Sequence, residues 1–472
     1  MRLIIFCLLG FFVPLSAVAQ TGTWTLEQCI EQALKNNIDV QLAGVSAQQA
    51  SQTWKNSIAA ATPDINLNAG QFFQSGRSID RFTNQFVQTT VSSNNFQLQS
   101  SVLLYAGGQI RNGIKQSNYL WLASESDLKT IEQNIALNVA NLFLQIIQAK
   151  ELNASAEETL KNTNSQLLRT KKLYEAGVVN EGQVLNLEAQ KANDVTALTN
   201  ARNQETLALT NLKMMLRLPA ESKFDIIRPE ITNYRVERYP ADQQQLFDSA
   251  IKRRPDVQAA MYRQKAATYA RKIARGGMMP VLSAGGNLSS VYSSNAKTVS
   301  SATISGFEAI GRVQGTNEIV EVPNIHYTLQ TIDFTKQIRD NFGQSLGFNL
   351  SLPIYGKLQA RNTALRATID EIRAKLNSEK IVQNLYSEVV SAYNSFSSSM
   401  ERYEAAIKGL EAQVRNMEFV TKRFEAGQSN VFELQLAQTN ATTAKNNLTS
   451  VRFEYIFRKM VLDFYMGKPL GL

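Results

Sequence analysis

The sequence contains few of the residues that build catalytic or metal centres. Its 472 residues include two cysteines and one histidine, His326, so no cluster is available to complete a zinc site. Gly108 to Lys115 comes close to the spacing of a phosphate-binding loop. However, no lysine directly follows the second glycine, and no Ser or Thr follows that position. No nucleophile–base pair can be proposed either. The sequence therefore predicts a protein that is not an enzyme, with no catalytic residue, metal site or cofactor.

Long apolar runs are also scarce. Residues 1–19 have the form of a secretory signal peptide, with an apolar run from Leu3 to Val13 followed by Ala17-Val18-Ala19 as a cleavage motif. Cys7 lies in this segment, which leaves Cys29 without an internal disulfide partner, and neither cysteine occupies the position expected for lipid attachment. No mature segment approaches the roughly 18 consecutive apolar residues of a membrane helix. An exported chain of this kind is either soluble or a membrane β-barrel.

Concentrated charge is the third feature that the sequence lacks. Lys and Arg number 49 against 40 Asp and Glu, which gives a net charge of +9. The basic residues are scattered along the chain, whereas a nucleic-acid-binding surface concentrates them on one element or face. We therefore expect no nucleic-acid partner.

An internal repeat dominates what is present. Residues 33–41 align with 250–258 at an offset of 217, which holds through Pro63 and Pro280. Further along, Tyr105 and residues 109–112 align with Tyr355 and residues 359–362 at an offset of 250, and the same offset aligns residues 173–177 with 423–427. Three such matches in order, with constant offsets, indicate one duplicated unit whose second copy has an enlarged loop. We assign 20–217 to the first repeat, 218–245 to a connector near the equator of the barrel predicted below, and 246–472 to the second repeat.

Each repeat is predicted to run helix, two strands, long helix, turn, shorter helix. Residues 107–176 contain no proline and carry a wide apolar stripe with 3–4 spacing. About 70 residues at 1.5 Å each make a helix on the order of 100 Å long. In each repeat the two shorter helices together are about as long as the long helix. In the first repeat, 26–61 and 180–217 match 107–176. In the second repeat, 246–279 and 430–466 match 357–426. Each repeat would then contribute two helical columns.

The periodicity changes from 3.6 to 2 between the helices. The strands are expected at about 64–74, 95–105, 281–292 and 343–354. In the last of these, Leu346, Phe348 and Leu350 alternate with small and amide residues. A strand of about ten residues with one apolar face and one polar, water-facing face is typical of membrane β-barrels. Tyr105 and Tyr355 would close the second strand of each pair as membrane-interface aromatics. The Ser-, Thr-, Asn- and Gly-rich segments 75–93 and 293–342 are expected to be outward loops.

Four strands cannot close a membrane barrel, because single-chain barrels begin at about eight strands. Two chains would form a barrel filled by side chains, whereas three chains supply an open one. The predicted fold class is thus mostly α with membrane β. A duplicated helix–strand–strand–helix–helix unit forms, as a homotrimer, a 12-strand β-barrel on a long 12-helix α-barrel.

The pattern resembles the TolC-like outer-membrane efflux factors over essentially the whole mature chain. It shares Thr25 to Gln28, Ala33 to Asn37, the paired repeat, and the helix-tip segments 173–177 and 423–427. The resemblance implies a passive exit duct in the outer membrane of a Gram-negative bacterium, surrounded by outer-membrane lipid and extending into the periplasm. It also implies docking to a periplasmic adaptor and an inner-membrane pump, in a tripartite efflux or type I secretion system.

The resemblance also suggests functional residues. Family members carry an acidic pair past the second tip glycine that lines the periplasmic aperture. Those positions are Glu433 and Leu436 here, with Gln183 and Asn186 in the first repeat, so only one acidic ring is retained. The helix tips, with Glu175, Gly177, Glu425 and Gly427, would form the adaptor-docking surface.

Two other functions fit parts of the pattern. The chain could be a soluble periplasmic coiled-coil scaffold with a small ordinary sheet, or a self-standing passive porin that needs no pump. Helices of about 70 residues favour a periplasm-bridging duct over a porin, which has no need of them.

Overall fold

The computed structural model describes residues 23–79, 86–227, 236–356 and 358–468. The predicted signal peptide lies outside the described residues, as does part of the predicted connector. The chain divides into two compact units. Unit 1 comprises residues 1–50, 120–264 and 374–472, and unit 2 comprises residues 51–119 and 265–373.

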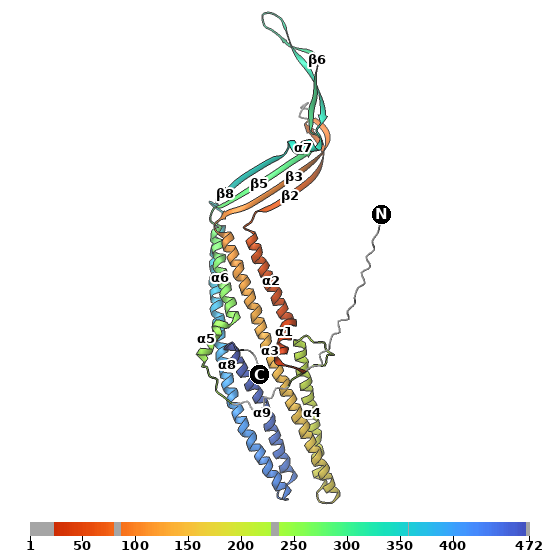
Figure 1. The fold of residues 1–472 in the computed structure, drawn as a ribbon, viewed down its shortest axis with the longest axis vertical. Coiled ribbons are helices and arrows are strands. Elements are labelled where there is room, and N and C mark those ends of the chain that lie inside the picture. The colour runs from red at the N-terminus through yellow and green to blue at the C-terminus, as the bar shows by residue number, and fades with distance from the viewer. Residues whose placement is uncertain (1–22, 80–85, 228–235, 357, 469–472) are drawn as a thin grey trace, which may run out of the picture. The chain divides into compact units, whose positions relative to one another are not determined.

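The helices follow the duplicated order (Figure 1). Their bounds are α1 Leu26–Asn36, α2 Ile38–Ala59, α3 Gln109–Glu175, α4 Glu181–Met215, α5 Gln243–Arg253, α6 Pro255–Gly276, α7 Phe334–Asp340, α8 Gln359–Glu425 and α9 Val431–Tyr465. The long helices α3 and α8 have 67 residues each, and α4 and α9 have 35 each. Among the described residues, no helix combines the length and the apolarity that crossing a membrane requires.

Both of the predicted N-terminal helices are broken where the sequence predicts single helices over 26–61 and 246–279. In the second repeat Pro255 follows Arg254, which adopts an extended conformation (φ −67°, ψ 120°) because proline disfavours a helical residue before it. In the first repeat Asn37 takes the same conformation (φ −64°, ψ 135°), and its side-chain oxygen accepts the N–H of Asp39 at 2.8 Å. Each break thus separates a short helix, α1 or α5, from a longer one, α2 or α6.

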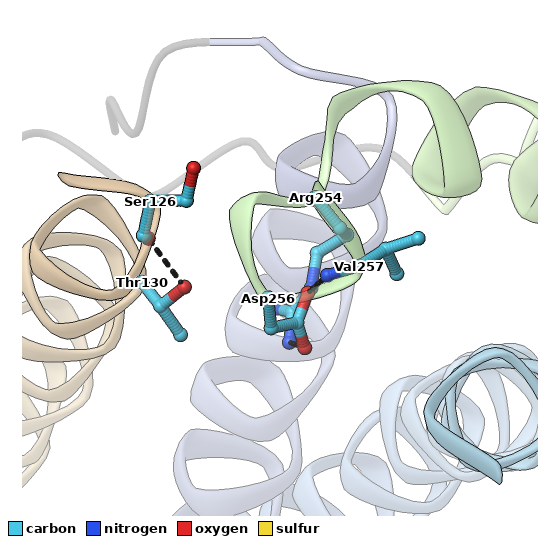
Figure 2. Close-up of polar contacts among 5 residues, drawn as sticks. All are labelled: Ser126, Thr130, Arg254, Asp256 and Val257. Carbon is cyan, nitrogen blue, oxygen red and sulfur yellow. Dashed lines mark hydrogen bonds and ion pairs between the residues drawn. The ribbon is translucent and has the colours of Figure 1, made fainter. Parts of the chain in front are cut away.

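Figure 2 shows the break at Arg254 in unit 1. The guanidinium of Arg254 donates to both carboxylate oxygens of Asp256, at 3.1 and 2.7 Å, and Asp256 also accepts the N–H of Val257 at 2.9 Å. On α3, the hydroxyl of Thr130 donates to the carbonyl of Ser126 at 2.9 Å. The bidentate pair is mostly shielded from solvent and anchors the start of α6.

The core of unit 1 combines both repeats. Its buried residues come from α1, α2, α3, α4, α5, α6, α8 and α9, together with the chain around the parallel strand pair β1 (Thr23–Trp24) and β4 (Asp225–Ile226). Many occur as repeat-related pairs, which include Cys29 with Leu246, Ala33 with Ala250, Val40 with Val257, Ile135 with Leu385, Val139 with Val389, and Leu212 with Leu462. Thr25 and Asp242, also related by the offset of 217, both cap their helices with a capping box.

Beyond this core, unit 1 contains two helical hairpins, α3 with α4 and α8 with α9 (Figure 1). Ion pairs at the surface join α3 to α4, Lys171 with Glu188 at 2.7 Å, and α8 to α9, Arg402 with Glu454 at 2.7 Å. Lys445 on α9 and Glu158 on α3, 2.7 Å apart, join the two hairpins.

Unit 2 contains a four-stranded antiparallel sheet in the order β2–β3–β5–β8. The strands are β2 Asp64–Ile79, β3 Phe86–Ala106, β5 Val281–Ser293 and β8 Gly343–Ser351. The register aligns Leu67, Leu98 and Leu288 in one row. An adjacent row on the other face holds Asn66, Gln99, Asn287 and Ser345. On β8 this row of leucines continues at Gln344, and Leu346 and Phe348 follow on the same face, so the sheet has one largely apolar face and one polar face.

The predicted outward loops are largely strand. β2 and β3 extend into 75–93, and within 293–342 lie the antiparallel hairpin β6 (Lys297–Arg312) with β7 (Ile319–Thr331) and the helix α7. His326 lies on β7 rather than in a loop. The high Ser, Thr and Asn content suggested loops, but β-branched residues such as Thr298, Val299 and Thr303 pair well across strands.

The sheet meets its helices at short junctions. Gly107 (φ +58°) connects β3 to α3, and a Cβ there would lie 2.4 Å from the carbonyl oxygen of Gly276, so only glycine fits. Gly108 therefore belongs to this turn rather than to a phosphate loop. β8 ends at Ser351, before the predicted 354, because Pro353 cannot donate to the ladder.

Candidate functional site

The free ends of the two helical hairpins in unit 1 contain most of the residues suggested by the sequence. At each end the long helix closes with the same backbone pattern. The N–H of Val178 donates to the carbonyl of Leu173, and that of Gln428 to the carbonyl of Arg423, both at 2.8 Å. Gly177 and Gly427 take left-handed conformations, with φ of +75° and +71°. This is the Schellman arrangement, in which a left-handed residue ends the helix.

The helices that follow begin with equivalent caps. Asn180 accepts the N–H of Gln183 at 3.2 Å, and Asn430 accepts the N–H of Glu433 at 2.9 Å. Since an N-cap aligns the first turn of its helix, it sets where residue 183 or 433 lies relative to the tip. The two tips therefore have the same backbone and differ in their side chains.

Glu433 lies in a polar cluster at the second tip. Its Oε2 atom accepts the Ser429 hydroxyl at 2.6 Å and lies 3.8 Å from a guanidinium nitrogen of Arg423. The side chains of Arg423 and Glu433 are 40% and 45% exposed, so water screens their attraction. The carboxylate at the predicted aperture position is thus accompanied by a cation from its own chain.

The first tip lacks both charges, because Leu173 and Gln183 occupy the equivalent positions. Gln183 is half-buried, and its side-chain oxygen has no hydrogen-bond partner among the described residues. Leu436 and Asn186 are exposed. The structure thus brings Glu433 together with Arg423, which the sequence reasoning missed. The signal for this pair was the simultaneous replacement of Leu173 and Gln183 between the repeats.

The surface of the tips is open and partly apolar. Glu175, Gly177, Glu425 and Gly427 are all exposed, and a Cβ added to either glycine would meet nothing within 4 Å. Large apolar side chains accompany them: Val178 is 67% exposed and Phe432 is 70% exposed. Such exposed apolar groups on a hairpin end are suited to contact with another protein.

In unit 2 the two predicted interface tyrosines lie in different settings. Tyr105 lies on β3, paired with Leu282, whereas Tyr355 lies four residues beyond the end of β8. Both are exposed. Tyr355 therefore does not close a strand, because the strand ends before Pro353.

Groups that could hold a metal ion do not gather in the described parts of the chain. There, no three or more His, Cys, Asp or Glu residues lie close enough together to hold a metal ion. Cys29 is buried in the core of unit 1, and burial, followed by the charge of Glu27, raises the pKa of its thiol to about 12. A thiol in that environment is inert.

Comparison with known proteins resolves which family these features represent. A family model described as outer membrane efflux protein matches residues 29–216 and 246–467, most of the chain. The chain belongs to the outer membrane efflux protein family. The predicted resemblance and the predicted location in the outer membrane are confirmed.

Two curated members of the family show the extent of the sequence similarity. Outer membrane efflux protein BepC of Brucella suis biovar 1 is 24% identical over 186 residues, which cover 39% of this chain and 39% of BepC. Pyoverdine export outer membrane protein OpmQ of Pseudomonas aeruginosa is 25% identical over 274 residues, covering 57% of this chain and 56% of OpmQ. The chain thus matches less than two thirds of the length of either relative.

The fold is shared more widely than the sequence. A solved structure of CusC comes from a study of its folding and transmembrane channel formation. The structural alignment covers 94% of this chain and 92% of the CusC chain. Its TM-score is 0.76 and its sequence identity is 16%. The chain fold implied by the resemblance to the TolC-like efflux factors is therefore confirmed.

Proposed function

We propose that this chain is one subunit of a homotrimeric outer-membrane channel. The channel is a passive exit duct from periplasm to exterior that docks a periplasmic adaptor and an inner-membrane pump. Family membership supports outer-membrane efflux, and the exposed hairpin ends support docking. The duct itself carries no energy source, so the pump drives transport and selects the substrate.

The observation that carries the proposal is the amphipathic sheet of unit 2. Its apolar face carries strongly exposed side chains: Leu67 is 73% exposed, Leu346 77% and Phe348 70%. Burying such a face in lipid is favourable, at about 25 cal/mol per Å² of apolar surface. The opposite face carries amides, hydroxyls and glycines, as the lumen of a membrane barrel requires.

The edges of the same sheet support the trimer. In the described parts of the chain, β2 pairs only with β3 and β8 only with β5, which leaves one open edge on each strand. Open edges do not occur in the hydrocarbon region, where each unpaired backbone group costs several kcal/mol. Pairing β8 of one copy with β2 of the next removes both open edges of this four-stranded sheet. Three copies joined in this way give twelve strands.

Matched arginine substitutions on β8 test the proposal. Phe348 and Asn349 are neighbours that point to opposite faces of the sheet. Phe348→Arg places a charge on the lipid face, at a cost of about 2–4 kcal/mol near the membrane centre. We expect it to reduce recovery in the outer membrane and to abolish complementation of dye efflux in a deletion strain. Asn349→Arg adds the same charge to the lumen face and should leave membrane recovery intact.

The outcomes separate the alternatives. Recovery of the wild-type protein in the soluble periplasm, or equal effects of the two substitutions, would contradict the membrane channel. Normal dye efflux in the deletion strain, together with ion conduction by the purified protein, would instead favour a porin independent of a pump.

A further inference from the structure

A polar pocket lies between the two helical hairpins of unit 1, on the core side of the tips. It is lined by α3, α4, α8 and α9, which Figure 1 shows as the two hairpins, and has a volume of about 350 Å³. Its lining combines threonine hydroxyls and glutamine and asparagine amides with the apolar side chains of Ala156, Leu187, Ala197 and Met417. At the ~30 Å³ that each molecule occupies in the liquid, this volume holds roughly ten waters, enough for a partly hydrated ion.

One charged residue, Asp194 on α4, lines this pocket. The residue is 6% exposed, so it is more than nine-tenths buried. Its Oδ1 atom accepts the amide of Gln190 at 2.8 Å, and the oxygen of Gln190 in turn accepts the amide of Gln435 on α9 at 2.7 Å. This relay of side chains ties the carboxylate of the first hairpin to the second hairpin.

The other carboxylate oxygen is not satisfied. Asp194 Oδ2 is buried and has no hydrogen-bond partner among the described residues. The same holds for Oδ1 of Asn446, an α9 residue that lines the same pocket. No Lys, Arg or His is present among the described residues that line it. A buried carboxylate without a counter-charge is strongly unfavourable, so a positive charge at this place is stabilising.

The repeat shows that the helix does not itself require an acid at this position. The residue that corresponds to Asp194 at the offset of 250 is Ala444, on the equivalent helix α9. The carboxylate is therefore a feature of this pocket rather than of the helical hairpin.

We infer that the pocket binds a monovalent metal cation, potassium or sodium, through Asp194 Oδ2 and Asn446 Oδ1. Carboxylate, amide and hydroxyl oxygens are hard donors that suit hard cations. A calcium ion takes six to eight oxygens, and its affinity depends on the charge of its ligands. This pocket supplies one negative charge, which matches a monovalent ion. Bound between α4 and α9, the ion links the two hairpins of one subunit at a place separate from the tips.

Thallium(I), which substitutes for potassium and scatters anomalously, is the direct probe. Crystals of the full-length detergent-extracted protein, soaked in thallium(I) acetate, should give an anomalous peak within contact distance of Asp194 Oδ2. The peak should be lost in Asp194→Asn, which keeps the size of the side chain and removes its charge. Asp248→Asn is the matched control. Like Asp194, Asp248 accepts a hydrogen bond from the side-chain amide of the residue four positions before it, Gln244, at 2.9 Å, but Asp248 is exposed.

A solution measurement accompanies the diffraction. Replacing N-methylglucamine chloride by potassium chloride at constant ionic strength should raise the melting temperature of the helices by about 2–4 °C in the wild type and in Asp248→Asn. Asp194→Asn should show no such rise. Absence of the peak in wild-type crystals, its persistence in Asp194→Asn, or an equal potassium effect in all three proteins would overturn the assignment and leave a water-filled pocket.

Discussion

At the scale of single residues, the two tips differ through a linked pair of changes. Leu173 and Gln183 in the first repeat become Arg423 and Glu433 in the second. A carboxylate introduced alone would add a bare negative charge at the second tip. The guanidinium introduced with it lies 3.8 Å away and reduces that charge. In the proposed trimer, the aperture ring would therefore hold three carboxylates, each with a nearby arginine.

This pairing predicts opposite effects of two substitutions on cation block of the single channel. Glu433→Ala removes the carboxylate and should weaken the block produced by a multivalent cation added from the periplasmic side. Arg423→Leu restores the residue of the first repeat, exposes the negative charge of Glu433, and should strengthen the block. The measurement is the blocking concentration in planar bilayers. If Glu433→Ala leaves it unchanged, Glu433 is a solvated helix residue rather than an aperture residue.

Cys29 gives a test of the core of unit 1. With the thiol pKa raised to about 12, roughly one thiol in 10⁴ is ionised at pH 8, and the side chain is fully buried. We expect no reaction with a disulfide reagent in the native protein and full reaction after denaturation. Cys29→Ala combined with Ser46→Cys, a residue exposed on α2, should react in the native state. Rapid native labelling at Cys29 would contradict its place in the core.

The same shift predicts the direction of a pH effect. Because burial raises the pKa above its ordinary value of 9.0, the contribution of Cys29 to folding stability is fully present below pH 9. It is lost as the pH rises from 9 towards 12, since the unfolded chain ionises first.

At the scale of the elements, the repeat conserves the helix starts and stops. Asn180 and Asn430 cap α4 and α9, Gly177 and Gly427 end α3 and α8, and each first helix is broken at an equivalent position. These caps and glycine turns set the length of each helix, while apolar packing holds the two helices of each hairpin together. The tips can therefore vary in side chains without a change in backbone.

The tip glycines allow the docking role to be separated from the turn. Asparagine tolerates the left-handed conformation better than other residues, and nothing lies within 4 Å of an added Cβ at Gly177 or Gly427. We expect the double variant Gly177→Asn, Gly427→Asn to assemble normally in the outer membrane, to lose co-purification with the adaptor, and to lose export. Loss of membrane assembly would show instead that these glycines act only in the turn.

Much of this arrangement follows from local sequence signals. The absence of proline from 107–176 and the glycine at its end predict α3 closely, because helix breakers act on their own neighbours. The break at Arg254 could have been predicted from Pro255, whereas the break at Asn37 has no such signal. The β6–β7 hairpin was missed because its polar composition resembles a loop. The contact between Arg423 and Glu433 depends on how the tip folds, so residue spacing alone does not predict it.

At the scale of the whole molecule, the proposed channel requires that the sheet close into a barrel. The described residues of unit 2 form a four-stranded sheet with two open edges, and the interior of a membrane excludes such edges. The modest hydrophobic content of 44% fits this design, since alternating strands and a wet lumen require less apolar sequence than membrane helices. The number of chains in the assembly decides whether the barrel is an open duct of twelve strands or a barrel with too few strands to leave a passage.

Native mass spectrometry of the mature protein, extracted from outer membranes in mild detergent, tests this most directly. The proposed channel predicts one dominant species with the mass of three chains, which persists when the detergent is stripped in the gas phase. Asn349→Arg, on the lumen face, should give the same species. A dominant mass of one or two chains would contradict closure of twelve strands and with it the trimeric duct.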